Sequence, residues 1–317
     1  MAIINVSPGT NISTLIASAS VAEGDVLLLE DGVYYQSVLI SKNNIRIVSE
    51  NCRAVFDGFG FLASAFILNG VSGVEIIGVT IRNYIGYGIY LNGGSANRIV
   101  SNTIYDIEGN GIFAVTSTAN LIWRNWIRNV LDGILLASTS TNNQVIQNFI
   151  RDCSNEGLEV FLSEDANNTL IENKVQDCGD HCIEVFGANC LVYRNNVSNA
   201  ASSGYYLVSG SGIMAIENRG EHNQTGCIVN GFNAFIARND FSNNRGKGVD
   251  VFTSYNIIQS NLITKNRGSG LVLENTANYN FIYKNKIECN TPLDIVTGGG
   301  TGNNFLRNQT GFRPKCD

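Results

Sequence analysis

Acidic side chains and one histidine are concentrated in two short segments of this sequence, and equivalent residues of the two segments lie 25 positions apart. Cleavage of a glycosidic bond needs two carboxyl groups with different pKa values, because one donates a proton while the other acts as base or nucleophile. A histidine beside such a pair can hold or relay the proton. The predicted catalytic residues are Glu156, Glu159, Asp180, His181 and Glu184.

The elements that position these residues follow from a repeat. An asparagine recurs every 21 to 25 residues from Asn102 to Asn308, within short segments rich in β-branched side chains. A second short segment in each period begins at a glycine, as in Gly88-Ile-Tyr-Leu91. Both segments are typical of strands bounded by turns, and a period in the low twenties is typical of a solenoid. We therefore predict an all-β parallel β-helix of about 11–12 coils, with the asparagines stacked in a ladder at the turns.

Aligning the coils on this repeat places the acidic residues in two columns. The position before the glycine reads Asp132, Glu156 and His181 in successive coils. The position two residues after it, which points outward, reads Glu159, Glu184, Tyr206, Ile228 and Asp250. Neighbours in a column lie about 4.8 Å apart, and like charges at that spacing destabilise a sheet and push at least one carboxyl pKa upward. A chain selected only for stability has little reason to keep this arrangement.

Further polar residues are expected to contact a substrate. Lys247 and Asp250 lie three coils beyond His181, about 14 Å away, at a distance that suits a separate sugar subsite. Arg128 and Arg151 form an outward pair that either reaches an acidic sugar or relieves the acidic cluster. The predicted substrate-binding residues are Asp132, Tyr206, Arg128, Arg151, Asp177, His222, Lys247 and Asp250. Two other interpretations of the cluster remain open: a solvated acidic strip, or calcium bound at Glu156, Glu159 and Glu184.

The chain is predicted to form a single domain over residues 1–317. Residues 1–24 are expected to cap it, because Asn11 precedes a short amphipathic helix with Ile12, Leu15 and Ile16 on one face. Residues 25–310 form the coils, and residues 311–317 form a C-terminal tail. The cap covers strand edges that would otherwise pair with other chains.

A capping helix, the segment Glu23-Gly-Asp-Val-Leu-Leu-Leu29, and repeated Asn and Gly-Ile coils together resemble the pectin-lyase-like superfamily of right-handed parallel β-helices, over essentially the whole chain. Ser154-Asn-Glu-Gly157 followed by Gly179-Asp-His-Cys182 also resembles the polygalacturonase signatures NTDG and GDDC. By this resemblance Glu156, Asp180 and His181 stand at catalytic aspartate positions. Glutamate and histidine replace two of the aspartates, and the family's later Gly-His-Gly and Arg-x-Lys are missing. The likeness therefore supports the location of a site but not pectin as its substrate.

Composition limits the partners. A net charge of −6 and a pI near 5.1 argue against nucleic acid. No segment is apolar enough to span a membrane, and the first residues lack the features of a signal peptide. The chain is then cytoplasmic, or secreted or cell-surface if a leader was removed. No zinc-type cysteine spacing exists, so neither a metal nor another cofactor is expected apart from the calcium alternative. Cys153 and Cys178 occupy equivalent positions that allow a disulfide without requiring one.

These observations favour a carbohydrate-active enzyme that binds an extended polysaccharide or oligosaccharide along one strand face and cleaves a glycosidic linkage by carboxylate acid/base chemistry. A polysaccharide lyase or C5 epimerase is the second hypothesis, with His181 or Tyr206 as base and calcium neutralising a uronate. The third is a non-catalytic glycan-binding, adhesive or tailspike-like β-helix. A homotrimer is compatible with all three.

Overall fold

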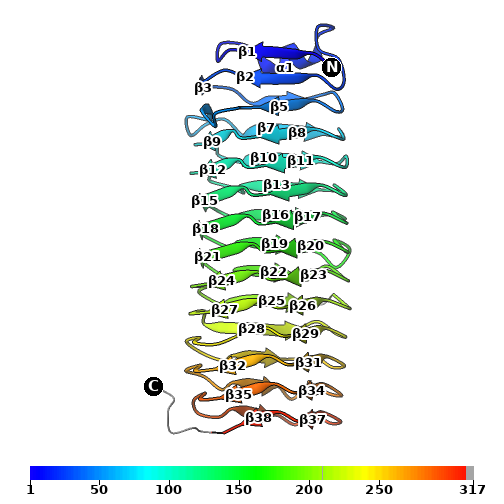
Figure 1. The fold of residues 1–317 in the computed structure, drawn as a ribbon, viewed down its shortest axis with the longest axis vertical. Coiled ribbons are helices and arrows are strands. Elements are labelled where there is room, and N and C mark those ends of the chain that lie inside the picture. Colours follow the sequence, from blue (N-terminus) through cyan, green and yellow to red (C-terminus); the bar gives the residue numbers. More distant parts are fainter. Residues whose placement is uncertain (209, 312–317) are drawn as a thin grey trace. The chain divides into compact units, whose positions relative to one another are not determined.

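The computed structural model describes residues 1–208 and 210–311, which divide into two compact units, residues 1–154 and 155–317. In each unit short strands pair in parallel with the strands one coil before and after, so every unit is a parallel β-helix (Figure 1). Almost every full coil contributes a strand to each of three sheets, called A, B and C here. In the coil of residues 235–251 only an isolated bridge at Asp240 stands at the sheet B position, so sheet B is interrupted there. The expected C-terminal tail, residues 311–317, lies outside the described residues except for Gly311.

In unit 1 the order of strands within each sheet follows the coils. Sheet A contains β1 (Ile3–Val6), β2 (Val26–Leu29), β5 (Arg46–Val48), β8 (Glu75–Ile77), β11 (Arg98–Val100), β14 (Leu121–Trp123) and β17 (Gln144–Ile146). Sheet B contains β3 (Gly32–Tyr34), β6 (Ala54–Asp57), β9 (Thr80–Arg82), β12 (Thr103–Tyr105), β15 (Trp126–Val130) and β18 (Phe149–Cys153). Sheet C contains β4 (Val38–Ile40), β7 (Ser64–Asn69), β10 (Tyr87–Asn92), β13 (Ile112–Val115) and β16 (Ile134–Ala137).

Unit 2 has the same arrangement. Sheet A contains β20 (Thr169–Ile171), β23 (Leu191–Tyr193), β26 (Met214–Ile216), β29 (Phe235–Ala237), β31 (Ile257–Gln259), β34 (Phe281–Tyr283) and β37 (Asn304–Leu306). Sheet B contains β21 (Lys174–Cys178), β24 (Asn196–Ser198) and β27 (Arg219–Glu221), then separately β32 (Leu262–Thr264), β35 (Lys286–Glu288) and β38 (Gln309–Thr310). Sheet C contains β19 (Leu158–Val160), β22 (Ile183–Val185), β25 (Ser203–Val208), β28 (Thr225–Asn230), β30 (Val249–Val251), β33 (Leu271–Leu273) and β36 (Ile295–Thr297). The described residues make about 13 turns, where 11–12 were expected.

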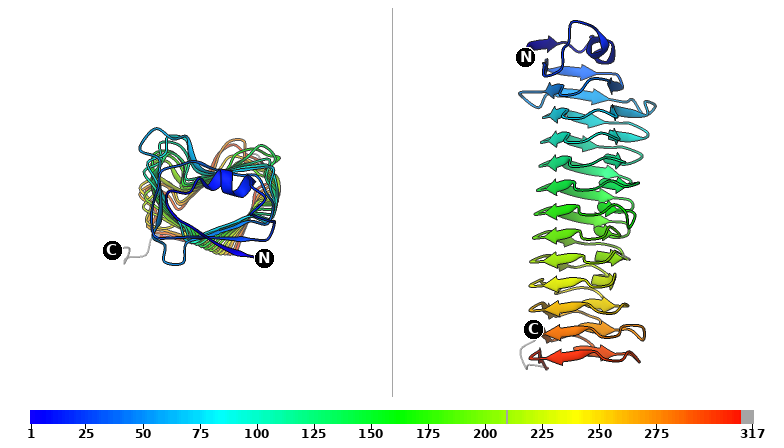
Figure 2. Two further views of the ribbon diagram at one scale, coloured as in Figure 1. Left: turned by 90° about the horizontal axis from the view of Figure 1, so that it is seen from above. Right: turned by 90° about the vertical axis from the view of Figure 1, so that its right-hand side faces the viewer.

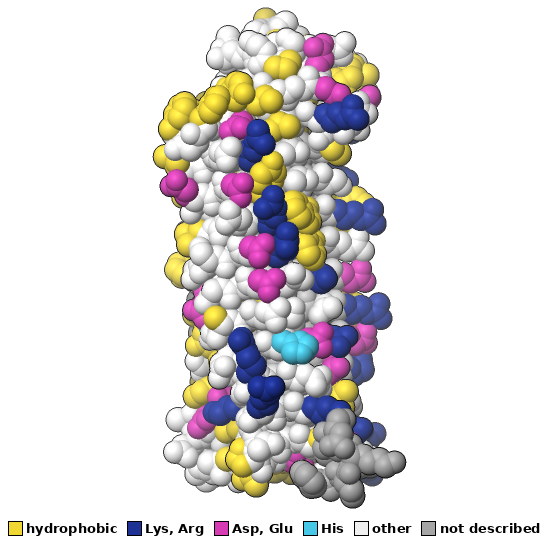
Figure 3. Space-filling model, turned by 90° about the vertical axis from the view of Figure 1, so that its left-hand side faces the viewer, with side chains coloured by type: hydrophobic (Ala, Val, Ile, Leu, Met, Phe, Trp, Pro, Cys, Tyr) yellow, Lys and Arg dark blue, Asp and Glu magenta, His cyan; other side chains and the backbone are white. Residues whose placement is uncertain are grey.

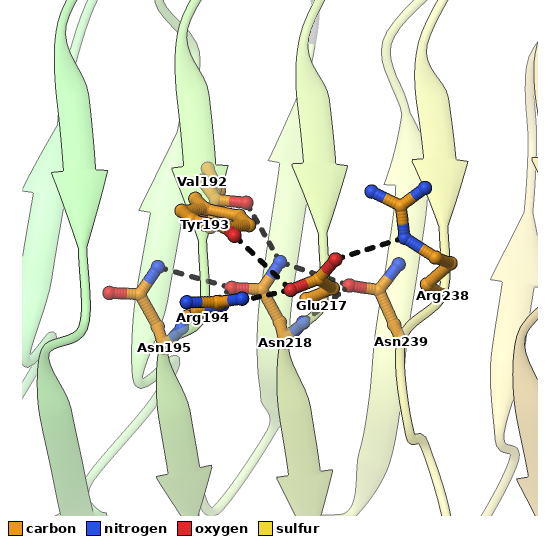
Figure 4. A network of polar contacts seen from close by, with 8 residues as sticks. All are labelled: Val192, Tyr193, Arg194, Asn195, Glu217, Asn218, Arg238 and Asn239. Carbon is orange, nitrogen blue, oxygen red and sulfur yellow. Dashed lines mark hydrogen bonds and ion pairs between the residues drawn. The ribbon is translucent and has the colours of Figure 1, made fainter.

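The asparagine ladder is confirmed, and it explains why each coil has three strands where the repeat suggested two. The residue before each ladder asparagine has a positive φ, 56° at Arg124 and 56° at Glu217, so the chain turns sharply there from sheet A into sheet B. Asn218 donates from Nδ2 to Val192 O at 2.8 Å and to Asn239 Oδ1 at 3.0 Å, and it accepts from Asn195 (Figure 4). The side-chain amides thus satisfy backbone groups that this turn leaves without a strand partner.

The capping helix is also confirmed. α1 (Ile12–Ala17) begins at Asn11, whose side chain accepts a hydrogen bond from Thr14 N. Ile12 and Ile16 are fully buried, and Figure 2 shows the helix lying across the open end of the first coil. No helix in the described part of the chain is long and apolar enough to cross a membrane.

Apolar side chains pointing inward from all three sheets fill the core of each unit. Cys153 and Cys178 are buried, and the thiol Sγ of each approaches a backbone carbonyl within its own strand, at 3.9 Å and 3.8 Å. Cys182, Cys190 and Cys227 are buried as well, as expected of small apolar side chains in a narrow core.

Candidate active site

The outward column of unit 2 is built by sheet C, and its predicted register is correct. Glu159 in β19 pairs with Glu184 in β22, which pairs with Tyr206 in β25. Leu158 and Val160 point inward on either side of Glu159 and are fully buried. Glu159 and Glu184 are only 6% and 7% exposed, although they point away from the core. The two carboxylates therefore lie one strand apart where water screens their repulsion poorly.

Glu156 lies two residues before β19, and Gly157 between them is required by the packing. A Cβ on Gly157 would lie 2.1 Å from Val175 Cγ1 and 2.7 Å from Cys182 O, so no larger residue fits. Gly157 N donates to His181 O at 3.1 Å, which brings the chain at Glu156 beside the chain at His181 in the next coil. Glu156 is 6% exposed and His181 is 8% exposed. The column before the glycine therefore holds a buried acid beside a buried imidazole.

The imidazole of His181 is fixed at both ring nitrogens. Nδ1 accepts from Ser203 N at 3.2 Å and lies 2.6 Å from Ser203 Oγ, so the ring proton is assigned to Nε2. Nε2 lies 3.4 Å from Asp180 Oδ1. The ring packs against Tyr206 with its centroid 4.5 Å away. Burial lowers the pKa of His181 more than the Asp180 carboxylate and the Ser203 hydrogen bond raise it, so the imidazole is neutral near pH 7.

A second group of charges on the same sheet surrounds Lys247. Its Nζ donates to Asp250 Oδ2 at 2.7 Å and to Glu274 Oε1 at 2.8 Å. Burial raises the pKa of Asp250 despite Lys247, and its Oδ1 is buried without a hydrogen-bond partner in the described residues. The Lys247 hydrogen bond lowers the pKa of Glu274. Burial alone lowers the pKa of Lys247, but its two hydrogen bonds outweigh this and the pKa is raised.

Glu274 was missed by the sequence analysis, since it follows β33 and lies outside the aligned columns. The only sequence signal for it is a lysine–aspartate pair three residues apart with an acidic residue in the next coil.

The other predicted residues lie on turns and on sheet B. Asp177 accepts from Asn199 Nδ2 at 2.9 Å and from Gln176 Nε2 at 3.1 Å, as the ordinary role of a turn aspartate requires. His222 is exposed on the equivalent turn two coils after Asp177. Asp132 is a buried residue of unit 1, 4% exposed, at the start of sheet C strand β16.

Arg128 and Arg151 are paired across β15 and β18 of sheet B, as predicted. The Arg128 guanidinium stacks 4.7 Å from the Tyr105 ring centre and 5.2 Å from that of Trp126. Arg151 lies 5.8 Å from the Trp126 ring and 3.5 Å from Asp152 Oδ2. The two arginines therefore belong to an aromatic face of sheet B in unit 1, and not to the sheet C face of the carboxylates.

A neutral histidine, an aspartate and several buried carboxylates on one parallel-strand face define a β-helix with a candidate acid/base site. The chain belongs to the family described as the right-handed β-helix region, whose model matches residues 30–170 and 160–310. The expected membership of the pectin-lyase-like superfamily of right-handed parallel β-helices is thereby confirmed. Comparison with curated proteins gives no significant match.

Several solved structures share this fold. The mannuronan C-5 epimerase AlgE6 A-module of Azotobacter vinelandii is 15% identical, with a TM-score of 0.59 over 99% of this chain and 89% of that chain. The GH136 lacto-N-biosidase of Eubacterium ramulus is 14% identical, with a TM-score of 0.63 over 98% and 68%. The Streptococcus pneumoniae surface protein and adhesin PfbA is 11% identical, with a TM-score of 0.53 over 90% and 91%. Identities this low show a common fold alone.

Proposed function

We propose that the chain binds an extended glycan along the outward face of sheet C in unit 2 and hydrolyses a glycosidic linkage there. The observation that carries this proposal is the register of Glu159 with Glu184 beside the fixed His181–Asp180 pair. Related folds that are named as an epimerase and a lacto-N-biosidase make a carbohydrate ligand the reasonable choice.

The sign of the local charge favours hydrolysis. Strands β19, β22 and β25 contain two glutamates and no lysine or arginine. A negative surrounding stabilises the positively charged, oxocarbenium-like transition state of glycoside hydrolysis. The same surrounding opposes the anion that forms when a proton is removed beside a uronate carboxylate. Elimination or epimerisation at this position therefore requires an added cation.

In the proposed reaction Glu156 and Asp180 form the acid/base pair. One carboxyl group donates its proton to the leaving oxygen as the glycosidic bond breaks, and the other accepts a proton from the attacking water. Glu159 and Glu184 stabilise the positive charge that develops on the sugar ring. His181 directs its Nε2 proton toward Asp180, 3.4 Å away, while Tyr206 packs against the imidazole and limits its rotation.

A polysaccharide panel tests the proposal. The purified chain is incubated with neutral and acidic polysaccharides, with and without EDTA, and the products are followed by reducing ends, ultraviolet absorbance and chain length. Hydrolysis predicts new reducing ends, no unsaturated product and no effect of EDTA. Glu156→Gln and His181→Ala are expected to lose this activity. If both variants match the parent in every assay, the site assignment is wrong.

One observation favours a lyase or C5 epimerase as the second candidate: Tyr206 packs against His181 and pairs with Glu184, which places a phenol that can act as base or acid beside the carboxylates. Calcium bound to carboxylate oxygens such as those of Glu156, Glu159 and Glu184 would then provide the missing cation. An ultraviolet-absorbing product, or altered uronate stereochemistry at constant chain length, either of them abolished by EDTA, would identify this chemistry. Binding without any chemical change would instead indicate an adhesive module.

A further inference from the structure

A basic pocket lies on the turns that lead from sheet B to sheet C in unit 2. Its volume is about 450 Å³, and it is lined by His222, Arg245, Lys265, Arg267 and three asparagines. Figure 3 shows a histidine side chain on this face, with Lys or Arg side chains and Asp or Glu side chains close to it. None of the described residues that line the pocket is acidic, although the whole chain carries a net charge of −6. The pocket therefore differs in charge from the carboxylate site on sheet C.

The pocket is built by the repeat. Asn199, His222, Asn243 and Lys265 occupy the same turn position in four successive coils, with φ values of 62°, 60°, 59° and 57°. This left-handed turn makes their side chains project from the same side of each coil. Backbone hydrogen bonds join adjacent turns, such as that from His222 N to Asn243 O at 3.1 Å. The lining is therefore held at the regular spacing of the coils.

Arg245 is held in place without losing its charge. Its Nη2 donates to Ala200 O, two coils away, at 2.6 Å. Among the described residues neither Arg245 nor Arg267 forms an ion pair with a carboxylate. Two arginines on the turns that follow sheet A in the same unit behave differently, since Arg194 and Arg238 both bind Glu217, at 2.8 Å and 3.0 Å (Figure 4).

We propose that this pocket binds an oxyanion, a carboxylate or a sulfate, carried by an acidic polysaccharide. Guanidinium groups pair well with planar or tetrahedral oxyanions, and the asparagine amides can donate to the remaining oxygens. A volume of about 450 Å³ falls in the range of roughly 300–1,000 Å³ typical of small-ligand sites, which accommodates a sugar ring with its acidic group. The proposal names the substrate class and rests on the proposed function only in taking the ligand to be a glycan.

The test measures binding separately from cleavage. Dissociation constants are determined by calorimetry for oligogalacturonate, for a sulfated dextran oligomer, for neutral dextran of equal length and for inorganic phosphate. One of the two acidic glycans is expected to bind, and Arg245→Gln with Arg267→Gln is expected to weaken it about tenfold or more, because charge-assisted hydrogen bonds are lost. Added salt should weaken binding to the parent more than binding to this double variant.

Matched controls separate this proposal from general charge effects and from the proposed hydrolysis. Arg194→Gln with Arg238→Gln removes the same two charges from sites already paired with Glu217, and should leave binding unchanged. Glu184→Gln should lose cleavage but keep binding of the acidic glycan. Four results would each overturn the proposal. They are equal binding of neutral dextran, binding of inorganic phosphate alone, tighter binding of single-stranded DNA than of the acidic glycans, and unchanged binding in the double variant. Loss of cleavage alone in Glu184→Gln does not bear on it.

Discussion

The outward column of sheet C has no charged residue in unit 1 and three acidic residues in unit 2, on strands that pair in the same way. In unit 1 the column is Leu39, Ile67, Tyr90, Phe113 and Leu135. In unit 2 it is Glu159, Glu184, Tyr206, Ile228, Asp250, Val272 and Val296. The backbone therefore accepts either kind of side chain at this position. Acidic residues are not needed to form these coils, so their presence in unit 2 calls for an explanation other than folding.

The two columns also differ in energy. In unit 1 the ring of Phe113 packs 4.9 Å from that of Tyr87 and 5.5 Å from that of Tyr90, and such aromatic pairs contribute about 0.5–1.5 kcal/mol each beyond burial. In unit 2 Glu159 faces Glu184 with little exposure to water. One column stabilises its coils by ring packing, whereas the other places two carboxyl groups one strand apart with little exposure to water. This contrast is what an acid/base site placed on a structural repeat should look like.

The largest expected effect comes from removing charge in the acidic column. Glu184→Gln should lower kcat/KM on the glycan by about 10²–10³-fold, the usual cost of removing one group that stabilises charge in the transition state. Its urea midpoint should be unchanged or higher, because repulsion with Glu159 is relieved. Activity and equilibrium unfolding measured on one preparation check both parts. A variant that is fully active but less stable would make the acidic column structural and remove the contrast between the units.

Most of the fold was predictable because asparagine occupies an equivalent position in successive coils from Asn102 to Asn308. The asparagines set the period, and the period gave the correct pairing of Glu159 with Glu184 and Tyr206. The ladder was expected at turns, but the division of each asparagine-bearing segment into two strands was not predicted, because a positive φ at residues as different as Arg124 and Glu217 leaves no mark in the sequence.

The site was predictable only where it lies on strands. Turn residues such as Arg245 and Arg267 stand outside the aligned columns, so their gathering around one pocket could not be foreseen. Ser203, which fixes the His181 ring, stands in the aligned column but is chemically unremarkable in sequence. Strand periodicity fixes neighbours within a column, whereas contacts between turns depend on side-chain conformations that spacing does not determine.

The asparagine ladder should contribute equally to the stability of the two units. Asn125 and Asn218 make the same set of hydrogen bonds, each through Nδ2 to a backbone carbonyl and to the next asparagine, and each is at most 2% exposed. Replacing either with alanine leaves buried partners unsatisfied, at about 1–3 kcal/mol per group. We expect Asn125→Ala and Asn218→Ala each to lower the free energy of unfolding by about 2–5 kcal/mol. Chemical denaturation measures this, and a large difference between them would show that the units depend on the ladder unequally.

Near neutral pH, the loss of stability on acidification is expected to arise in unit 2, because both histidines of the chain lie there. Burial lowers the pKa of His181 in the folded chain below its ordinary value of 6.5. The unfolded chain then binds the proton more readily, so this stability is complete above pH 6.5 and is lost as the pH falls from there toward the lower folded pKa. Urea midpoints at pH 7.5 and pH 5 should differ less in His181→Gln than in the parent. The exposed His222, replaced by glutamine, should keep the parent's difference.

The smallest effect is expected in the apolar column. Phe113→Leu keeps an apolar side chain but loses the ring contacts with Tyr87 and Tyr90, so the free energy of unfolding should fall by about 1–3 kcal/mol. Activity on the glycan should stay at the parent level, since the change lies in unit 1 and removes no charge. Unfolding by urea and initial rates are measured on the same preparation as Glu184→Gln. Phe113→Leu should lose stability but keep activity, whereas Glu184→Gln should lose activity but keep stability. A loss of activity in Phe113→Leu would mean that the apolar column also contacts the glycan.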